Sequence, residues 1–158
     1  MERIELDIPY MFVNSLTSLM ERMIGVPIKS GSRAKNIKAS EAIYIHSKGV
    51  FCSKMVFQLE ESLEWAVLSG MQAGGDVSLE MKRLYLGEFI NILSGHALTS
   101  INNAVGETSR LTVPVVGTVD LEEDAQYTHK CVLYFTSEYG NMELQLNYEL
   151  STATCVCV

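Results

Sequence analysis

Apolar residues recur every three to four positions in three segments of the chain, a spacing that places them on one face of an α-helix. The predicted helices cover residues 7–24, 60–71 and 78–104. Gly25 and Gly106 follow the first and third segments, where a glycine commonly ends a helix. The third helix would be about 40 Å long at 1.5 Å per residue, which makes it the longest predicted element.

Shorter segments rich in β-branched and aromatic residues predict β-strands. Residues 47–49 and 138–141 are hairpin-like turns between successive strands. The predicted strands cover residues 26–29, 42–46, 50–57, 111–119, 128–136 and 142–150. Because these strands follow one another in two runs, antiparallel pairing is favoured. The sequence therefore predicts an α+β fold in which helices pack against a mostly antiparallel sheet.

The length and composition are those of a globular protein, and we interpret residues 1–158 as a single domain. Apolar residues make up 47% of the chain and charged residues 20%, values that argue against a disordered chain. The formal net charge of -7 argues against a nucleic-acid partner, which requires clustered Lys and Arg. No stretch approaches the roughly 18 consecutive apolar residues of a membrane span, so we expect no membrane partner.

Four cysteines are scattered along the chain. Cys52 and Cys131 lie in apolar, strand-like segments, where a buried free thiol is the usual arrangement. Cys155 and Cys157 could hold a soft metal ion, but the sequence supplies no obvious further ligands. The acidic N-terminus lacks the apolar core of a signal peptide, and scattered cysteines then favour a reducing compartment. We therefore expect a cytoplasmic protein.

The third predicted helix has two different faces. The apolar face consists of Leu86, Phe89, Ile90, Leu93, Ala97, Ile101 and Ala104, and the opposite face of Met81, Leu84, Glu88, Asn91, Gly95, Thr99 and Asn102. The apolar face should pack on the sheet. Glu88 and Asn91 are three residues apart on the outer face, so their side chains point the same way. Gly95 lies one turn further and could let a partner approach closely, although a mid-helix glycine costs about 1 kcal/mol relative to alanine.

The pattern Glu-x-x-Asn is common by chance, so a match indicates function only if the element that carries it also fits. A second match, Glu138 and Asn141, falls in a predicted hairpin turn, where glycine and asparagine supply positive φ. We interpret that match as structural. Glu88 and Asn91 differ because an acid and an amide on an exposed helix face are free to reach into the site of another protein.

More of this segment than the polar pair follows a known pattern. The motif of the CheC/CheX group of chemotaxis phosphatases is a small or acidic residue, three others, Glu, two others, Asn, twenty-two others and Pro. Glu88, Asn91 and Pro114 fit this spacing, whereas Leu84 stands where the motif has Asp or Ser. The chain resembles this family over nearly its whole length. The flanking Gly87 and the presence of one such helix, where CheC proteins carry two, resemble the CheX branch in particular.

This resemblance implies a CheC-like fold and hydrolysis of the aspartyl-phosphate of a CheY-like response regulator in chemotaxis signalling. It implies that Asn91 reaches the phosphate and that Glu88 pairs with a lysine beside it. A carboxamide donates and accepts hydrogen bonds without being basic, so Asn91 would position a water rather than abstract its proton. The family's Mg²⁺ is held by the receiver, so we expect no cofactor and no metal ligands on this chain. The family also forms dimers that share β-structure between chains, which implies a homodimer.

Two alternatives stay open. A CheX-like module could bind a receiver or another signalling partner without turnover, and the departure at Leu84 leaves room for this. A small-molecule enzyme would need chemistry of its own, such as Cys52 or Cys131 meeting one of the isolated histidines. No glycine-rich phosphate loop follows a predicted strand, so this second alternative has no motif behind it.

Overall fold

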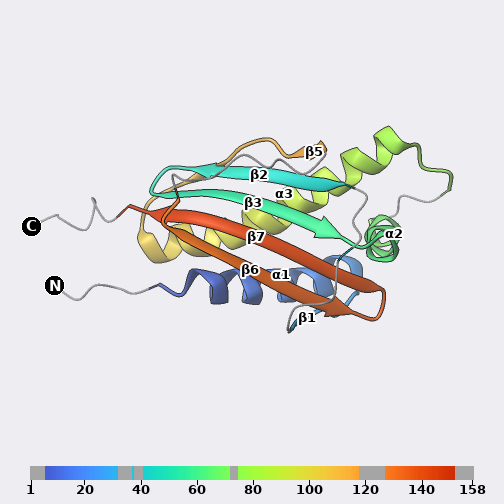
Figure 1. The fold of residues 1–158 in the computed structure, drawn as a ribbon, viewed down its shortest axis with the longest axis horizontal. Helices are drawn as coiled ribbons and strands as arrows, with labels where there is room; N and C mark the ends of the chain where they lie inside the picture. Colours follow the sequence, from blue (N-terminus) through green and yellow to red (C-terminus); the bar gives the residue numbers. More distant parts are fainter. Residues whose placement is uncertain (1–5, 32–36, 38–40, 72–74, 118–126, 152–158) are drawn as a thin grey trace, which may run out of the picture.

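The structure, a computed structural model, describes residues 6–31, 37, 41–71, 75–117 and 127–151 (Figure 1). Its elements are α1 (Ile8–Ile24), β1 (Lys29–Gly31), β2 (Ala42–Lys48), β3 (Phe51–Leu59), α2 (Glu61–Gly70), α3 (Leu79–Val105), β4 (Arg110–Leu111), β5 (Val115–Gly117), β6 (His129–Ser137) and β7 (Gly140–Leu150). The strands form one sheet of order β1-β6-β7-β3-β2-β4, in which β5 also pairs with β2. Every one of these pairings is antiparallel, so the predicted α+β fold is confirmed.

Two of the described helices, α1 and α3, begin and end at capping residues. The side chain of Asp7 accepts a hydrogen bond at the start of α1, and that of Ser78 does the same for α3. Gly25 and Gly106 end these two helices in the left-handed conformation, with φ of 66° and 83°. Local sequence therefore determines the helix ends, and all three predicted helices are confirmed to within one residue.

The core lies between the sheet and the two long helices, α1 and α3, which cover the same face of the sheet in Figure 1. Every phenylalanine of the chain is fully buried there, and these rings come from α1, β3, α3 and β6: Phe12, Phe51, Phe57, Phe89 and Phe135. Removing each ring from water contributes about 1.5–3 kcal/mol before the entropy of folding is counted. This burial fixes the rotation of α3 about its axis.

The predicted apolar face of α3 is correct except at its end. Six of its seven residues are buried, from Leu86 to Ile101, whereas Ala104 is exposed. Ala104 belongs to the last turn before the C-cap at Gly106, and the buried part of the face ends one turn earlier. Three residues outside the predicted face, Gly87, Ser94 and Leu98, are buried as well.

Two predicted strands differ from the structure. The strand predicted at 26–29 begins only at Lys29, although Val26 and Ile28 before it are buried. The strand predicted at 111–119 is split into β4 and β5, and its last two positions lie outside the described residues. Pro114 has no N–H for a ladder, while Thr112 bonds the backbone of His46 through both its N–H, at 2.8 Å, and its hydroxyl, at 3.0 Å. These constraints break the predicted strand.

The cysteines are only partly as predicted. Cys52 is exposed, so the prediction of a buried thiol is wrong there: neighbouring residues of β3 alternate between the two faces of the sheet, and position 52 faces away from the core. Cys131 is a half-buried free thiol. Cys155 and Cys157 lie outside the described residues. Across the part of the chain that the structure describes, no helix combines the length and apolarity needed to span a bilayer.

Candidate functional site

Glu88 and Asn91 lie in the middle of α3, on the face turned away from the core. Glu88 is exposed and Asn91 is half-buried, while Phe89 and Ile90 between them are fully buried. The side chains of Glu88 and Asn91 make no hydrogen bond or ion pair with any described residue. The predicted placement of the pair is therefore correct, and both groups are available to a partner. Their chemical roles stay predictions.

The chain that follows α3 turns back and runs along the same helix. Asn102 anchors this return: its Nδ2 donates to the carbonyl of Ser109 at 3.2 Å, and its Oδ1 accepts from the Ser109 N–H at 2.9 Å. The hydroxyl of Ser109 accepts from the backbone N–H of Phe51 at 2.9 Å. The returning segment is thereby attached to both α3 and β3 before it reaches the outer face of the helix.

The path of the returning segment explains why Pro114 follows Asn91 at the motif's spacing of twenty-two residues. A Cβ on Gly95 would meet Leu111 Cδ1 at 3.7 Å, and one on Gly87 would meet Pro114 Cβ at 3.9 Å. From Gly95 to Gly87 the helix rises about 12 Å, and from Leu111 to Pro114 an extended chain spans about 10 Å, so three residues of the return cover the same length as eight residues of the helix. Pro114 therefore lies beside the turn of α3 that carries Asn91. Leu111 of the same chain lies beside Gly95, which is half-buried, and the approach of a partner to Gly95 stays a prediction.

A groove of about 420 Å³ runs between α3 and the returning segment, and Glu88 and Asn91 both line it. Its volume falls in the range of ordinary binding sites. The remaining lining residues are Arg83, Leu84, Gly87, Leu111, Thr112, Val113, Pro114 and Val116. All three residues that fit the motif, at positions 88, 91 and 114, thus meet in one concavity.

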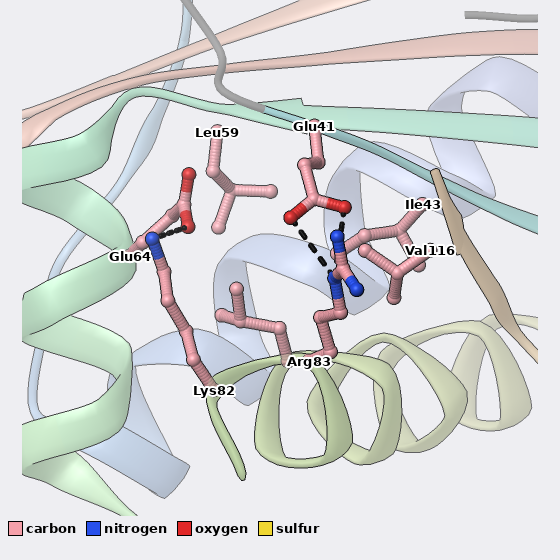
Figure 2. A pocket seen from close by; sticks show the side chains of 8 residues that line it. Glu41, Ile43, Leu59, Glu64, Lys82, Arg83 and Val116 are labelled. Carbon is pink, nitrogen blue, oxygen red and sulfur yellow. Dashed lines mark hydrogen bonds and ion pairs between the residues drawn. The ribbon is translucent and has the colours of Figure 1, made fainter. Parts of the chain in front are cut away.

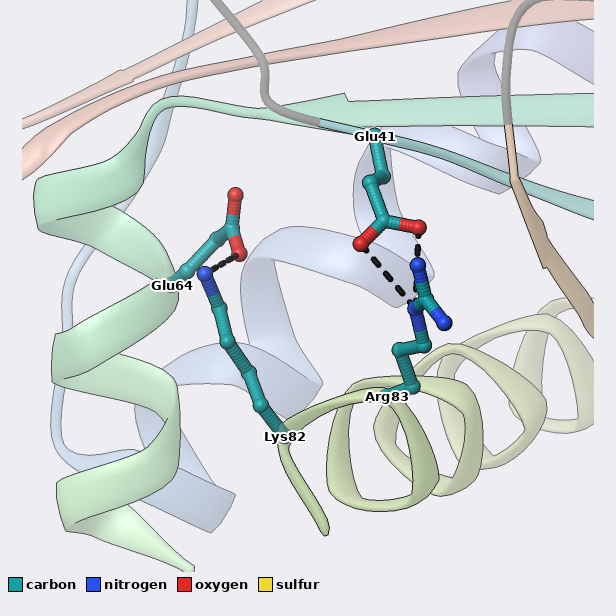
Figure 3. A network of polar contacts seen from close by, with 4 residues as sticks. All are labelled: Glu41, Glu64, Lys82 and Arg83. Carbon is teal, nitrogen blue, oxygen red and sulfur yellow. Dashed lines mark hydrogen bonds and ion pairs between the residues drawn. The ribbon is translucent and has the colours of Figure 1, made fainter. Parts of the chain in front are cut away.

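Two ion pairs hold the first turns of α3 beside this groove (Figure 3). Lys82 reaches Glu64 of α2 at 2.8 Å, and both side chains are largely buried. The Nε of Arg83 donates to both carboxylate oxygens of Glu41, each at 3.1 Å. Arg83 is therefore already neutralised by Glu41, and Glu88 is the charged groove residue that has no partner among the described residues.

The space between these ion pairs is not a substrate site. Figure 2 shows Glu64 with Lys82 and Glu41 with Arg83 lining the same small pocket. Its cavity volume is about 10 Å³, which is room for about one water molecule. We therefore place the candidate site in the groove.

Other chemistry considered from the sequence finds no support in the described residues. The Nη2 of Arg22 donates to the Nε2 of His96 at 3.2 Å, and His129 stacks on Tyr148 with ring centroids 4.9 Å apart. These rings have structural partners. Within the described ranges, no three His, Cys, Asp or Glu side chains gather closely enough to hold a metal ion. Glu138 and Asn141 flank a tight turn whose Gly140 has φ of 150°, so the structural interpretation of that second match is confirmed.

Part of the groove could not be found from the sequence. Thr112 and Val113 line it, although the sequence places them inside a continuous strand. The signal that could have revealed the break is Pro114, which is poorly suited to a central strand. Arg83 was also missed, because its charge alone does not distinguish it from other surface residues.

The fold is that of CheX and CheC-like chemotaxis proteins. CheX of Vibrio vulnificus superposes with a TM-score of 0.76 at 18% identity, covering 94% of this chain and 100% of that one. CheX of Desulfovibrio desulfuricans gives 0.71 at 20%, covering 91% and 100%. A complex of CheX and CheY with BeF₃ and Mg²⁺ from Borrelia burgdorferi gives 0.65 at 14%, covering 92% and 99%. No protein-family model and no curated protein sequence matches the chain. The CheC-like fold implied by the sequence resemblance is therefore confirmed.

Proposed function

We propose that this chain hydrolyses the aspartyl-phosphate of a CheY-like response regulator in chemotaxis signalling. The observation that carries this proposal is the position of Glu88 and Asn91, which line one groove on a CheX-type fold with no partners among the described residues. Glu88 would pair with a lysine of the receiver, and Asn91 would enter its phosphorylation site.

In this mechanism Asn91 positions the attacking water. Its carboxamide can accept a hydrogen bond from a water and donate another to a phosphoryl oxygen, which orients the water in line with phosphorus. Such hydrolysis needs little from the protein besides positioning, since a receiver's Mg²⁺ neutralises the charge on the phosphoryl group. Half-burial of Asn91 limits its rotamers and so supports this role. We expect no metal on this chain.

The likeness to known structures supports the choice of partner. One structure of this fold is a CheX–CheY complex that contains BeF₃ and Mg²⁺, and BeF₃ has the geometry and charge of a phosphoryl group. The outer face of α3 is free of the sheet, which leaves room for a receiver to approach Glu88 and Asn91.

Phosphate release from a phosphorylated receiver tests the proposal. Replacing Asn91 by alanine should lower the maximum rate by about a hundredfold, the usual effect of losing one positioned hydrogen-bonding group. Glu88→Ala should chiefly weaken receiver binding. Asn103→Ala and Glu80→Ala, two exposed positions of α3 outside the groove, are the matched controls. Equal rates for all four variants and the unaltered chain would contradict the mechanism.

A receiver-binding module without turnover is the second candidate. Leu84 favours it, because an exposed leucine stands where the motif has Asp or Ser. This candidate predicts that the chain binds a BeF₃-loaded receiver but does not change the rate at which the aspartyl-phosphate of a phosphorylated receiver decays. Measuring binding and phosphate release on the same preparation separates the two functions.

The homodimer implied by the sequence resemblance stays part of the proposal. Sedimentation velocity gives the mass directly, and a single species of twice the 17.6 kDa chain mass is expected. A monomer over the whole concentration range would exclude the dimer without bearing on the chemistry of the groove.

A further inference from the structure

Two apolar side chains stand exposed in the groove beside the polar pair. Leu84, one turn before Glu88 on α3, is 63% exposed, and Val113, from the break between β4 and β5, is 82% exposed. Single exposed apolar residues are ordinary on a protein surface. These two line one concavity and come from the two elements that form its walls. Removing both from water would strengthen any complex that covers them.

The charges of the groove indicate what could cover it. Arg83 is already bound by Glu41, whereas the carboxylate of Glu88 has no partner among the described residues. The groove therefore presents one free negative charge and one carboxamide between two apolar side chains. A complementary surface carries a cation next to an exposed apolar side chain.

We propose that Leu84 and Val113 select the receiver by holding one of its apolar side chains beside the lysine that pairs with Glu88. This inference rests on the proposed function and deepens it. Asp or Ser at position 84 would give the groove a polar wall, whereas leucine favours a receiver with an aliphatic or aromatic side chain at this contact. Leu84 and Val113 contribute to receiver affinity, which titration with a BeF₃-loaded receiver measures separately from turnover.

The chain offers matched controls for this experiment. Leu84→Ser and Val113→Thr remove the apolar contacts, and Val113→Thr does so at nearly constant shape. Leu79→Ser and Val115→Thr are the controls: these residues are 58% and 61% exposed, on α3 and β5, and neither lines the groove. The probes are CheY receivers, including that of Borrelia burgdorferi, each loaded with BeF₃ and Mg²⁺. Titration gives Kd, and phosphate release at saturating phosphorylated receiver gives the maximum rate.

Leu84→Ser should raise the Kd for a BeF₃-loaded receiver about tenfold, while the control variants match the unaltered chain. The loss should persist between about 0.05 and 0.5 M NaCl, because an apolar contact is not screened, whereas the loss caused by Glu88→Gln should shrink as salt rises. If both variants lost affinity only because they were misfolded, their losses would depend on salt in the same way.

Three results would overturn the inference. If Leu84→Ser binds as tightly as Leu79→Ser, the apolar contact is absent and the proposed function is untouched. If Leu84→Ser abolishes self-association and leaves receiver affinity unchanged, the groove is an interface between copies of this chain. If the unaltered chain binds none of the receivers and releases no phosphate, the proposed function itself fails, and the inference fails with it.

Discussion

Asn102 of α3 bonds both the N–H and the C=O of Ser109, so one side chain holds the segment that forms the outer wall of the groove. Ser109 is buried, and its hydroxyl also accepts from the backbone N–H of Phe51. Pro114 lies five residues further along this segment. The distance between the groove's two walls therefore depends on a contact far from Glu88.

Asn102→Ala should lower both stability and receiver affinity. The change leaves the buried N–H and C=O of Ser109 without their partners, which costs about 1–3 kcal/mol of unfolding free energy. Urea denaturation measures this loss, and titration with a BeF₃-loaded receiver measures the effect of the loosened wall. Asn103→Ala makes the same chemical change at the exposed neighbouring position. Equal denaturation midpoints for the two variants would show that the anchor contributes nothing.

The helices and their ends could be predicted because the information is local. Asp7, Ser78, Gly25 and Gly106 act on the turn in which they stand, and their effect needs no tertiary structure. The outer position of Glu88 follows in the same way from the helical period. Alternation within β3 places Cys52 on the face away from the core, but it does not predict exposure there, because Lys54 and Val56 on the same face are buried.

The groove could not be predicted because its second wall depends on pairing across the sequence. The break between β4 and β5 results from Thr112 bonding His46, a residue 66 positions earlier. The sequence around Thr112 does not indicate that His46 is its hydrogen-bond partner. The helical period likewise predicts on which face of α3 Gly95 lies, but not that Leu111 lies beside it.

The ion pair between Lys82 and Glu64 should matter more than the one between Arg83 and Glu41. Lys82→Met leaves the buried carboxylate of Glu64 without its cation, and we expect a loss of about 2–3 kcal/mol in unfolding free energy. Arg83→Met breaks a more exposed pair and should cost less than about 1 kcal/mol. Urea denaturation of both variants provides the comparison.

Two further measurements, at high salt and on a double variant, test whether the two ion pairs differ through burial. High salt should reduce the effect of Arg83→Met and leave that of Lys82→Met nearly unchanged, because buried charges are screened less. Lys82→Met combined with Glu64→Leu should recover much of the stability, since no uncompensated charge is left. A double variant as unstable as the sum of the two single changes would rule out this account.

Cys131 should react more slowly with iodoacetamide than Cys52. Burial raises the pKa of the Cys131 thiol, and the thiolate is the reactive form. At pH 8 we expect at least a tenfold slower alkylation of Cys131 than of the exposed Cys52, because the raised pKa of the thiol and restricted access both slow the reaction. Peptide mass spectrometry follows each cysteine separately. In urea the two cysteines should react at similar rates. If the ratio of their alkylation rates were the same in the folded and the unfolded chain, the fold would not be the cause of the slower reaction of Cys131.

Alkaline pH should destabilise the fold through Tyr148 and Cys131. The pKa of Tyr148 is raised, first by burial and then by the neighbouring thiolate of Cys131 and by Asp7. A raised pKa means that the folded state favours the neutral group, so this stability is complete below the group's ordinary pKa and is lost as pH rises through the folded-state value. Tyr148→Phe should therefore lose less unfolding free energy than the unaltered chain between pH 8 and about pH 11. Parallel pH dependence of the two chains would exclude Tyr148 as a cause.

Gly87→Ala and Gly95→Ala should change the unfolding free energy by similar amounts, but only Gly87→Ala should weaken receiver binding. Both lie inside α3, where alanine is favoured over glycine by about 1 kcal/mol. The added Cβ would make only ordinary contacts, at 3.9 Å from Pro114 in one case and 3.7 Å from Leu111 in the other. Urea denaturation should therefore show both variants stabilised by about 0.5–1 kcal/mol.

The functional difference arises because Gly87 lines the groove beside Glu88 and Gly95 does not. A methyl group at position 87 occupies space between α3 and Pro114, so Gly87→Ala should weaken receiver binding about tenfold, as an overpacked contact does. Gly95→Ala should bind and release phosphate as the unaltered chain does, because Gly95 does not line the groove. If Gly95→Ala lost affinity and Gly87→Ala kept it, the receiver would have to approach α3 nearer its C-terminal end, and the groove would not be the site.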